Sequence, residues 1–177
     1  APPYPFLVDM PEFPQVRPLD CTPVEQRRNL AMLGKIAEIA RARGLPFTFA
    51  VWSQHAFTYG DSQVEGLTED ILPDYNALGL RKVLDACPAI DGVQFRMNIE
   101  SGISEDRQAE FYNQQFLAIA DCAFPIRLDL RAKGLSCQTI ELARKHIPNT
   151  VISTKHWCEH LGMPYPMPAI QQADSTS

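Results

Sequence analysis

The sequence predicts an α/β protein made of parallel βα repeats, corresponding to about half of a TIM-type (β/α)8 barrel. Apolar, strand-like runs alternate four times with segments of helical spacing. Successive strand-like runs begin about 25 to 45 residues apart, close to the roughly 31 residues per unit of an eightfold barrel. A small open, doubly wound α/β sheet is the alternative fold.

The first repeat has the clearest helix signal. Residues 22–43 carry apolar side chains at helical spacing, and Gly44 follows them as a stop. Thr22 and Glu25 have the spacing of a capping box, which predicts where the helix begins. The apolar run 47–52 then predicts a buried strand.

The second repeat begins after a long polar and aromatic segment, 53–66, which predicts a loop. Thr68 is the expected cap of a helix over 68–86. The next strand is expected over 92–98.

The last two repeats follow the same order, and a serine opens each of their helices. Helices are expected over 105–121 and 136–145, and strands over 124–130 and 149–154. Strands that alternate with helices in this way form a parallel sheet with right-handed crossovers.

The domain organisation follows from these repeats. Residues 1–21 form an extended, proline-rich segment, residues 22–168 the βα domain and residues 169–177 a polar tail. Four strands leave two open sheet edges, which we expect the remainder of a barrel or a second chain to cover. Ala1 at the start favours the first of these, a chain that is part of a longer protein.

Composition narrows the range of partners. The net charge of −5 argues against a general nucleic-acid surface, which needs a basic excess. No apolar run approaches the ~20 residues that span a bilayer, so no membrane partner is expected. The five cysteines show no CxxC spacing, and no glycine-rich phosphate motif is present.

Two predicted strands alternate polar and apolar residues. Gln94, Arg96 and Asn98 share one face of the first, and Asp129 and Arg131 share one face of the second. An edge strand facing water explains one such pattern but explains two neighbouring strands poorly. In a barrel, the polar side chains would point inward and the apolar ones outward to the helices.

Reactive side chains also gather where the predicted strands end. Active sites of α/β barrels and open α/β sheets lie at this carboxyl edge. The candidate substrate-binding residues there are Trp52, Gln54, His55, Arg96, Asn98, Arg131, Lys133, Lys155, His156 and Trp157.

Three carboxylates at this edge, Glu100, Asp129 and Glu159, are the candidate catalytic groups. Two carboxyl groups that flank a sugar ring suffice for glycoside hydrolysis. The surrounding arginines and lysines favour an anionic substrate, such as a uronate or a phosphate. The alternative is a purely structural role, in which Arg96 and Asp129 belong to ion pairs that stabilise the fold.

A metal site has weaker support. His156 and His160 are four residues apart, but the HWCEH segment displaces the glutamate from its place in HExxH. Gly162 and Pro164 also argue against a long helix there. The sequence therefore predicts neither a metal nor a cofactor.

Four strand-plus-loop blocks carry a family resemblance: RGLPFTFAVWSQ, DGVQFRMNIESGI, PIRLDLRAKGL and TVISTKHWCEHLGMPYP. They resemble bacterial glycoside hydrolase-type (β/α)8-barrel proteins that are α-glucuronidase-like, over most of 25–168. The resemblance implies a carbohydrate substrate, polysaccharide degradation and a secreted or periplasmic protein. By position it makes Glu100 catalytic, and it makes Arg96, Asn98, Arg131 and Lys155 substrate-binding.

The leading hypothesis is therefore a glycoside hydrolase, or a fragment of one, acting on an acidic, uronate-containing carbohydrate. Two alternatives stay open. One is a metal-dependent sugar isomerase or epimerase of the barrel type, with His156, Glu159 or Asp129 as ligands. The other is a non-catalytic carbohydrate-binding domain that uses the aromatic side chains.

Overall fold

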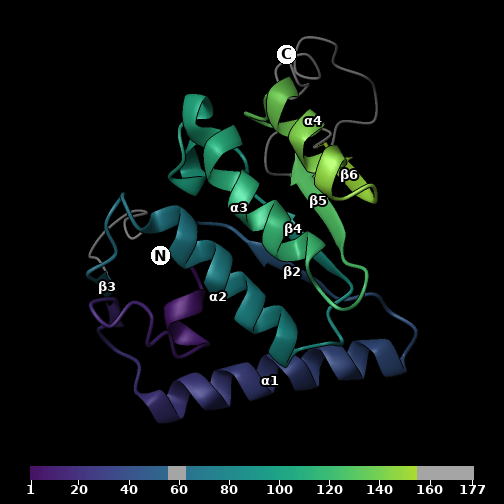
Figure 1. Ribbon diagram of the computed structural model, residues 1–177. Coiled ribbons are helices and arrows are strands. Elements are labelled where there is room, and N and C mark those ends of the chain that lie inside the picture. The colour runs from purple at the N-terminus through teal and green to yellow at the C-terminus, as the bar shows by residue number, and fades with distance from the viewer. Residues whose placement is uncertain (56–62, 155–177) are drawn as a thin grey trace, which may run out of the picture.

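A four-stranded parallel sheet forms the centre of the computed structural model, which describes residues 1–55 and 63–154 (Figure 1). The strands pair in the order β2-β4-β5-β6, so each crossover leads to the neighbouring position. Their bounds are β2 Thr48–Val51, β4 Gly92–Phe95, β5 Arg127–Arg131 and β6 Thr150–Ser153. The predicted α/β fold with parallel βα units is confirmed.

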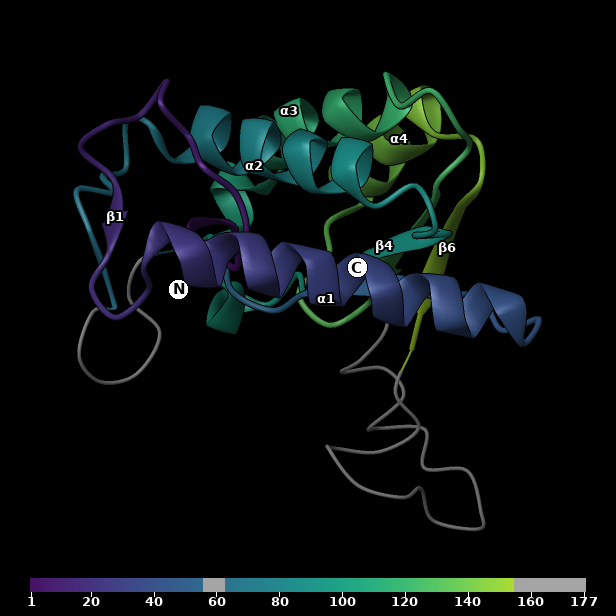
Figure 2. The ribbon, with the colours of Figure 1, turned by 90° about the horizontal axis from the view of Figure 1, so that it is seen from below.

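In the described part of the chain, four α-helices accompany the sheet: α1 Pro23–Ala42, α2 Leu72–Ala86, α3 Gln108–Ala120 and α4 Cys137–His146. Helices α2, α3 and α4 lie together in one layer on one side of the strands, whereas α1 runs along the border of the molecule (Figure 2). The sheet is open, with β2 and β6 as its outer strands within the described residues. Within the described residues the sheet is open and this helix layer lies on one of its faces (Figure 2), which agrees with the open α/β sheet given as the alternative fold. That the four units form part of a barrel stays a prediction.

The helix starts show which predictions from local sequence were correct. The side chain of Thr22 accepts a hydrogen bond from the backbone N–H of Glu25, whose own side chain completes the capping box of α1. Ser136 caps α4 by accepting a hydrogen bond from the backbone N–H of Thr139, without a capping box. Thr68 does not cap α2, because its hydroxyl donates to Asp70 instead and the helix begins only at Leu72.

The expected helix over 105–121 is two elements. A 3-10 turn, η3 (Glu105–Arg107), precedes α3, and the side chain of Ser104 makes no capping hydrogen bond to it. The expected strand over 92–98 also ends earlier, at Phe95, and Asn98 leads into a second 3-10 turn, η2 (Ile99–Ser101). The chain between β4 and α3 is therefore a bent connection that lies at the carboxyl edge.

The proline-rich N-terminal segment is packed on the domain. It begins with the 3-10 turn η1 (Tyr4–Phe6), and the ring of buried Tyr4 lies against Gly79 of α2 so closely that a Cβ on Gly79 would be 2.5 Å from it. Further along, β1 (Arg17–Pro18) pairs antiparallel with β3 (Val64–Glu65), so the expected loop 53–66 contains a short strand. This two-stranded ribbon has no signal in the sequence.

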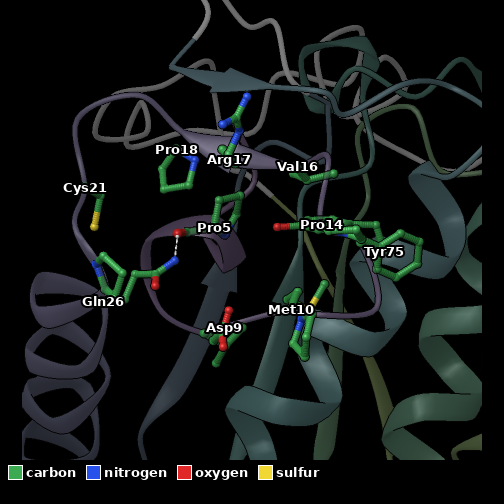
Figure 3. A pocket seen from close by; sticks show the side chains of 14 residues that line it. Pro5, Asp9, Met10, Pro14, Val16, Arg17, Pro18, Cys21, Gln26 and Tyr75 are labelled. Atoms are coloured by element: carbon green, nitrogen blue, oxygen red, sulfur yellow. Dashed lines mark hydrogen bonds between the residues drawn. The ribbon is translucent and has the colours of Figure 1, made fainter.

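A hollow of about 360 Å³ lies within this segment, and five prolines are among the fourteen residues that line it, together with Met10 and Tyr75 (Figure 3). The side chain of Gln26 closes one side by donating a 2.7 Å hydrogen bond to the carbonyl of Pro5. The hollow lies apart from the carboxyl ends of the four strands, and none of the predicted site residues lines it.

The two faces of the sheet differ in polarity. Val93, Phe95, Leu128 and Leu130 are fully buried beneath the helix layer. The ring of Phe95 lies 5.2 Å from that of Tyr112 in α3, so aromatic packing joins the sheet to the helices. Gln94 and Asp129, the residues between them in sequence, point to the other face. No helix of residues 1–55 and 63–154 lies over that face (Figure 2), which we call the uncovered face, and the candidate site lies there.

Candidate functional site

Arg96 is the centre of the candidate site. It follows β4 directly, and its side chain is buried with 8% exposed. Its Nε donates a 2.7 Å hydrogen bond to Oδ1 of Asn98, and its Nη2 forms an ion pair with Oε2 of Glu100. A buried guanidinium needs such partners, because desolvation of an isolated charge costs several kcal/mol.

Trp52, which follows β2, supplies an aromatic surface beside this ion pair. The guanidinium carbon of Arg96 lies 3.5 Å from the centre of the indole ring, a cation–π contact. Trp52 is nevertheless 53% exposed, which is unusual for so large an apolar side chain. The indole therefore offers solvent a flat apolar surface of the kind on which sugars stack.

Glu100 lies in η2, the 3-10 turn that begins directly after Asn98. Its side chain is 34% exposed. It is thus the more accessible member of the Arg96–Glu100 pair. A partly exposed carboxylate whose charge a guanidinium compensates can accept a proton or act as a nucleophile.

Asp129 lies in the middle of β5 on the uncovered face. Its two oxygens accept hydrogen bonds from neighbouring strands, one from Nε2 of Gln94 at 2.8 Å and one from the hydroxyl of Ser153. Gln94 is its direct partner in the β4–β5 register. This network crosses three strands and fixes the orientation of the carboxylate.

A shallow hollow of about 10 Å³ lies next to the ion pair, lined by Arg96, Asn98, Arg131 and Lys133. It has room for about one water molecule or the tip of one anionic group. Arg131 ends β5, and Lys133 follows it on the exposed loop before α4. Arg131 and Lys133 thus place two further cationic side chains beside the Arg96–Glu100 ion pair, in a chain whose net charge is −5.

His55 lies at the border of the site rather than in it. Its ring contacts the carboxylate of Glu69, which also receives a 2.8 Å hydrogen bond from Arg107. Burial raises the pKa of Glu69, but the hydrogen bonds from Arg107 and His55 outweigh it and hold the pKa below its ordinary value. The His55–Glu69–Arg107 chain ties the loop after β2 to η3.

Gln54 is fully buried, and its backbone holds the loop after β2 in place. Its N–H donates to the carbonyl of Ser101 at 2.8 Å, and its own carbonyl accepts a hydrogen bond from Asn76 of α2. Its side chain is thus inaccessible to a ligand in this structure, whereas Trp52 is 53% exposed.

Three residues that hold the loops of the site in place, Gln108, Tyr112 and Gly134, were not predicted from the sequence. Gln108 at the start of α3 donates to the carbonyls of Met97 (2.8 Å) and Gly134 (2.6 Å), which joins the loops after β4 and β5. Tyr112 donates to the carbonyl of Arg96 at 3.1 Å, and burial raises its pKa, which keeps the phenol protonated as a donor. The sequence did contain a signal for Gln108, because it is a polar residue on the apolar side of a predicted helix.

Gly134 is the third of these supporting residues. Its φ is +71°, and a Cβ there would lie 2.9 Å from Cα of Asn98. The loop after β5 thus packs directly against the backbone that carries the hydrogen-bond acceptor of Arg96.

The predicted site residues that follow β6 lie outside the described part of the chain. They are Lys155, His156, Trp157, Glu159 and His160. Within residues 1–55 and 63–154, no group of three or more His, Cys, Asp or Glu side chains is placed to hold a metal ion. The same residues contain no helix long and apolar enough to cross a membrane.

Comparison with known proteins gives no relative. No protein-family model, curated protein or solved structure matches the chain.

Proposed function

We propose that this chain is a glycoside hydrolase, or part of one, that binds an acidic, uronate-containing carbohydrate on the uncovered face of the sheet. The substrate would lie across the carboxyl ends of the strands, with a sugar ring on Trp52 and a carboxylate near Arg131 and Lys133. Glu100 would act as one of the two catalytic carboxylates.

One observation carries the proposal: the Trp52–Arg96–Glu100 arrangement beside a cationic hollow. It combines an exposed aromatic surface, a partly exposed carboxylate and a small hollow, lined by two arginines and a lysine, that admits the tip of one anionic group. Arginine and lysine side chains are the usual partners of a carboxylate ligand, and arginine can bind it through two parallel hydrogen bonds.

The chemistry requires two carboxyl groups with different tasks. One protonates the leaving oxygen while the glycosidic C–O bond breaks, and the other activates water or attacks the anomeric carbon. Glu100, as the ion-paired carboxylate, suits the second task. Asp129 and Glu159 are the candidates for the first, and water supplies the hydroxyl and the proton that complete hydrolysis.

The test is hydrolysis of a glucuronic-acid-containing oligosaccharide by the wild type and by Glu100→Gln. Loss of a catalytic carboxylate lowers the rate by about a hundredfold to ten-thousandfold, whereas binding measured by calorimetry persists. Glu105→Gln, which changes an exposed carboxylate in η3, is the matched control and keeps full activity. Turnover by Glu100→Gln at the wild-type rate would exclude this role.

A non-catalytic carbohydrate-binding domain is the second candidate function. It is favoured because two of the candidate catalytic carboxylates already have partners within the chain. Both oxygens of Asp129 already accept hydrogen bonds, and Glu100 is paired with Arg96. In that case glucuronate binds more tightly than glucose, Arg131→Ala weakens this binding, and no product forms during long incubation with the oligosaccharide.

A further inference from the structure

Helix α1 exposes a row of large apolar side chains. Met32, Ile36 and Ile39 are 50%, 47% and 44% exposed, although they lie in the middle of the longest helix of the described chain. The opposite face is the one that packs on the domain, where Ala37 is fully buried and a Cβ on Gly34 would lie 3.5 Å from Sγ of Cys87. Figure 2 shows α1 in front of the rest of the molecule along its whole length.

Three exposed apolar residues of α1, Met32, Ile36 and Ile39, follow the spacing of a coiled coil, whereas Val24 lies off this row. Steps of four and three residues connect the positions of one continuous row, which we name the α1 seam: Glu25, Asn29, Met32, Ile36, Ile39 and Arg43. Alternating steps of four and three are the a and d positions of a heptad, the pattern by which a helix contacts a partner helix. The seam extends for the full ~30 Å of a 20-residue helix.

We propose that a second copy of this chain occupies this face, so that two α1 helices pair antiparallel through their seams. The two-fold axis passes at the level of Gly34. In this register Ile36 of each copy packs on Met32 of the other, and Arg43 of each copy meets Glu25 of the other.

The charges at the two ends of the seam select a second copy as the occupant. Glu25 is acidic at one end and Arg43 is basic at the other, so the seam is complementary to itself only when the helices run in opposite directions. A shift by one step to place Met32 on Ile39 would instead bring Arg28 against Arg43. Like charges in direct opposition disfavour that register.

The residues that flank the seam are compatible with this pairing. Leu45, 59% exposed just beyond α1, would reach exposed Pro23 of the second copy. Oε2 of Glu25 accepts the capping hydrogen bonds, and a carboxylate has a second oxygen for the arginine. The two copies of Lys35 would be neighbours across the two-fold axis, and this like-charge pair opposes the pairing unless both long side chains turn into solvent.

Light scattering coupled to size exclusion, over a dilution series of the intact protein, tests the proposal. The wild type is expected to pass from dimer to monomer on dilution. Ile36→Glu places a charge in the apolar centre of the seam twice per dimer, so the dissociation constant rises at least about a hundredfold. Ala31→Glu introduces the same charge at an exposed position of α1 off the seam and leaves the constant unchanged.

Charge changes at the ends test the direction of the pairing. Arg43→Glu opposes Glu25 and raises the dissociation constant about tenfold, and adding Glu25→Arg restores much of the affinity. Circular dichroism shows that each variant keeps its helices. A wild type that stays monomeric throughout overturns the proposal, because a second copy then does not cover the seam. A dimer that Ile36→Glu leaves intact also overturns it, because the two copies then pair through another surface.

Discussion

At the scale of single residues, Arg96 shows how one side chain can organise a surface. Its guanidinium has Glu100 and Asn98 as polar partners and the indole of Trp52 as an apolar one. The alternation of polar and apolar residues along the sequence predicted the face on which Arg96 lies. The cation–π contact was not predicted, because Trp52 is 44 positions from Arg96 in sequence and only the pairing of β2 with β4 brings the residues that follow these strands together.

Gly134 gives a prediction at the same scale. Gly134→Ala is expected to destabilise the protein by about 2–3 kcal/mol, because a φ of +71° costs a non-glycine residue about 1–2 kcal/mol and the new methyl group would also press on Asn98. Gly44→Ala is the matched control, with a φ of +68° and no atom within 4 Å of the new Cβ.

Urea unfolding of the two variants separates backbone strain from steric contact. Gly44→Ala is expected to lose about 1–2 kcal/mol through strain alone. Equal losses of unfolding free energy in both variants would show that the close contact between position 134 and Asn98 does not add to the destabilisation.

At the scale of elements, local signals succeeded where the chain makes its own contacts. The capping residues of α1 and α4 satisfy backbone groups three positions away, so the sequence contained the complete interaction. The start of α2 was wrong because the hydroxyl of Thr68 had a nearer partner in Asp70. The β1–β3 ribbon was missed because its two strands are two residues each and lie 46 positions apart.

Gln108 gives the prediction at this scale. Gln108→Leu removes the donor that joins the loops after β4 and β5, which leaves the carbonyls of Met97 and Gly134 without it. The expected loss of stability is about 1–3 kcal/mol, because buried acceptors lose a hydrogen bond.

The control is Gln114→Leu, an exposed glutamine on the same helix, with an expected change within about 0.5 kcal/mol. Thermal unfolding measures both variants. If Gln108→Leu matches Gln114→Leu, the two loops are held by other contacts.

At the scale of the whole molecule, the sequence predicted the parallel sheet, the strand order of consecutive βα units and the polarity of its two faces. These features follow from periodicities that repeat through the chain. The candidate site was predicted as a set of residues, but the loops that bring Trp52, Arg96 and Glu100 together are fixed by long-range hydrogen bonds. Coverage of the outer edges of β2 and β6 by further strands or a second chain stays a prediction.

Glu69 gives a prediction about the pH dependence of overall stability, because it joins the loop after β2 to η3 through His55 and Arg107. Its folded pKa lies below the ordinary value of 4.5. The carboxylate therefore stabilises the fold above that value, and this contribution is lost as the pH falls through the folded pKa.

Chemical unfolding between about pH 3 and pH 7 compares the wild type with Glu69→Gln. The variant is less stable near neutrality, and the difference shrinks toward the acidic end. Glu110→Gln, which changes an exposed carboxylate on α3, stays parallel to the wild type. A constant difference between Glu69→Gln and the wild type at every pH would contradict the linkage.

The covering of one sheet face alone has a consequence for how this protein can change over evolution. Along β4 and β5, every second residue lies under the helices and its neighbours face outward, so adjacent codons encode separate properties. Substitutions at Val93 or Leu128 act on folding, whereas those at Arg131, on the other face, act on what the surface recognises. The outward positions can therefore diversify toward new ligands while the inward ones preserve the scaffold.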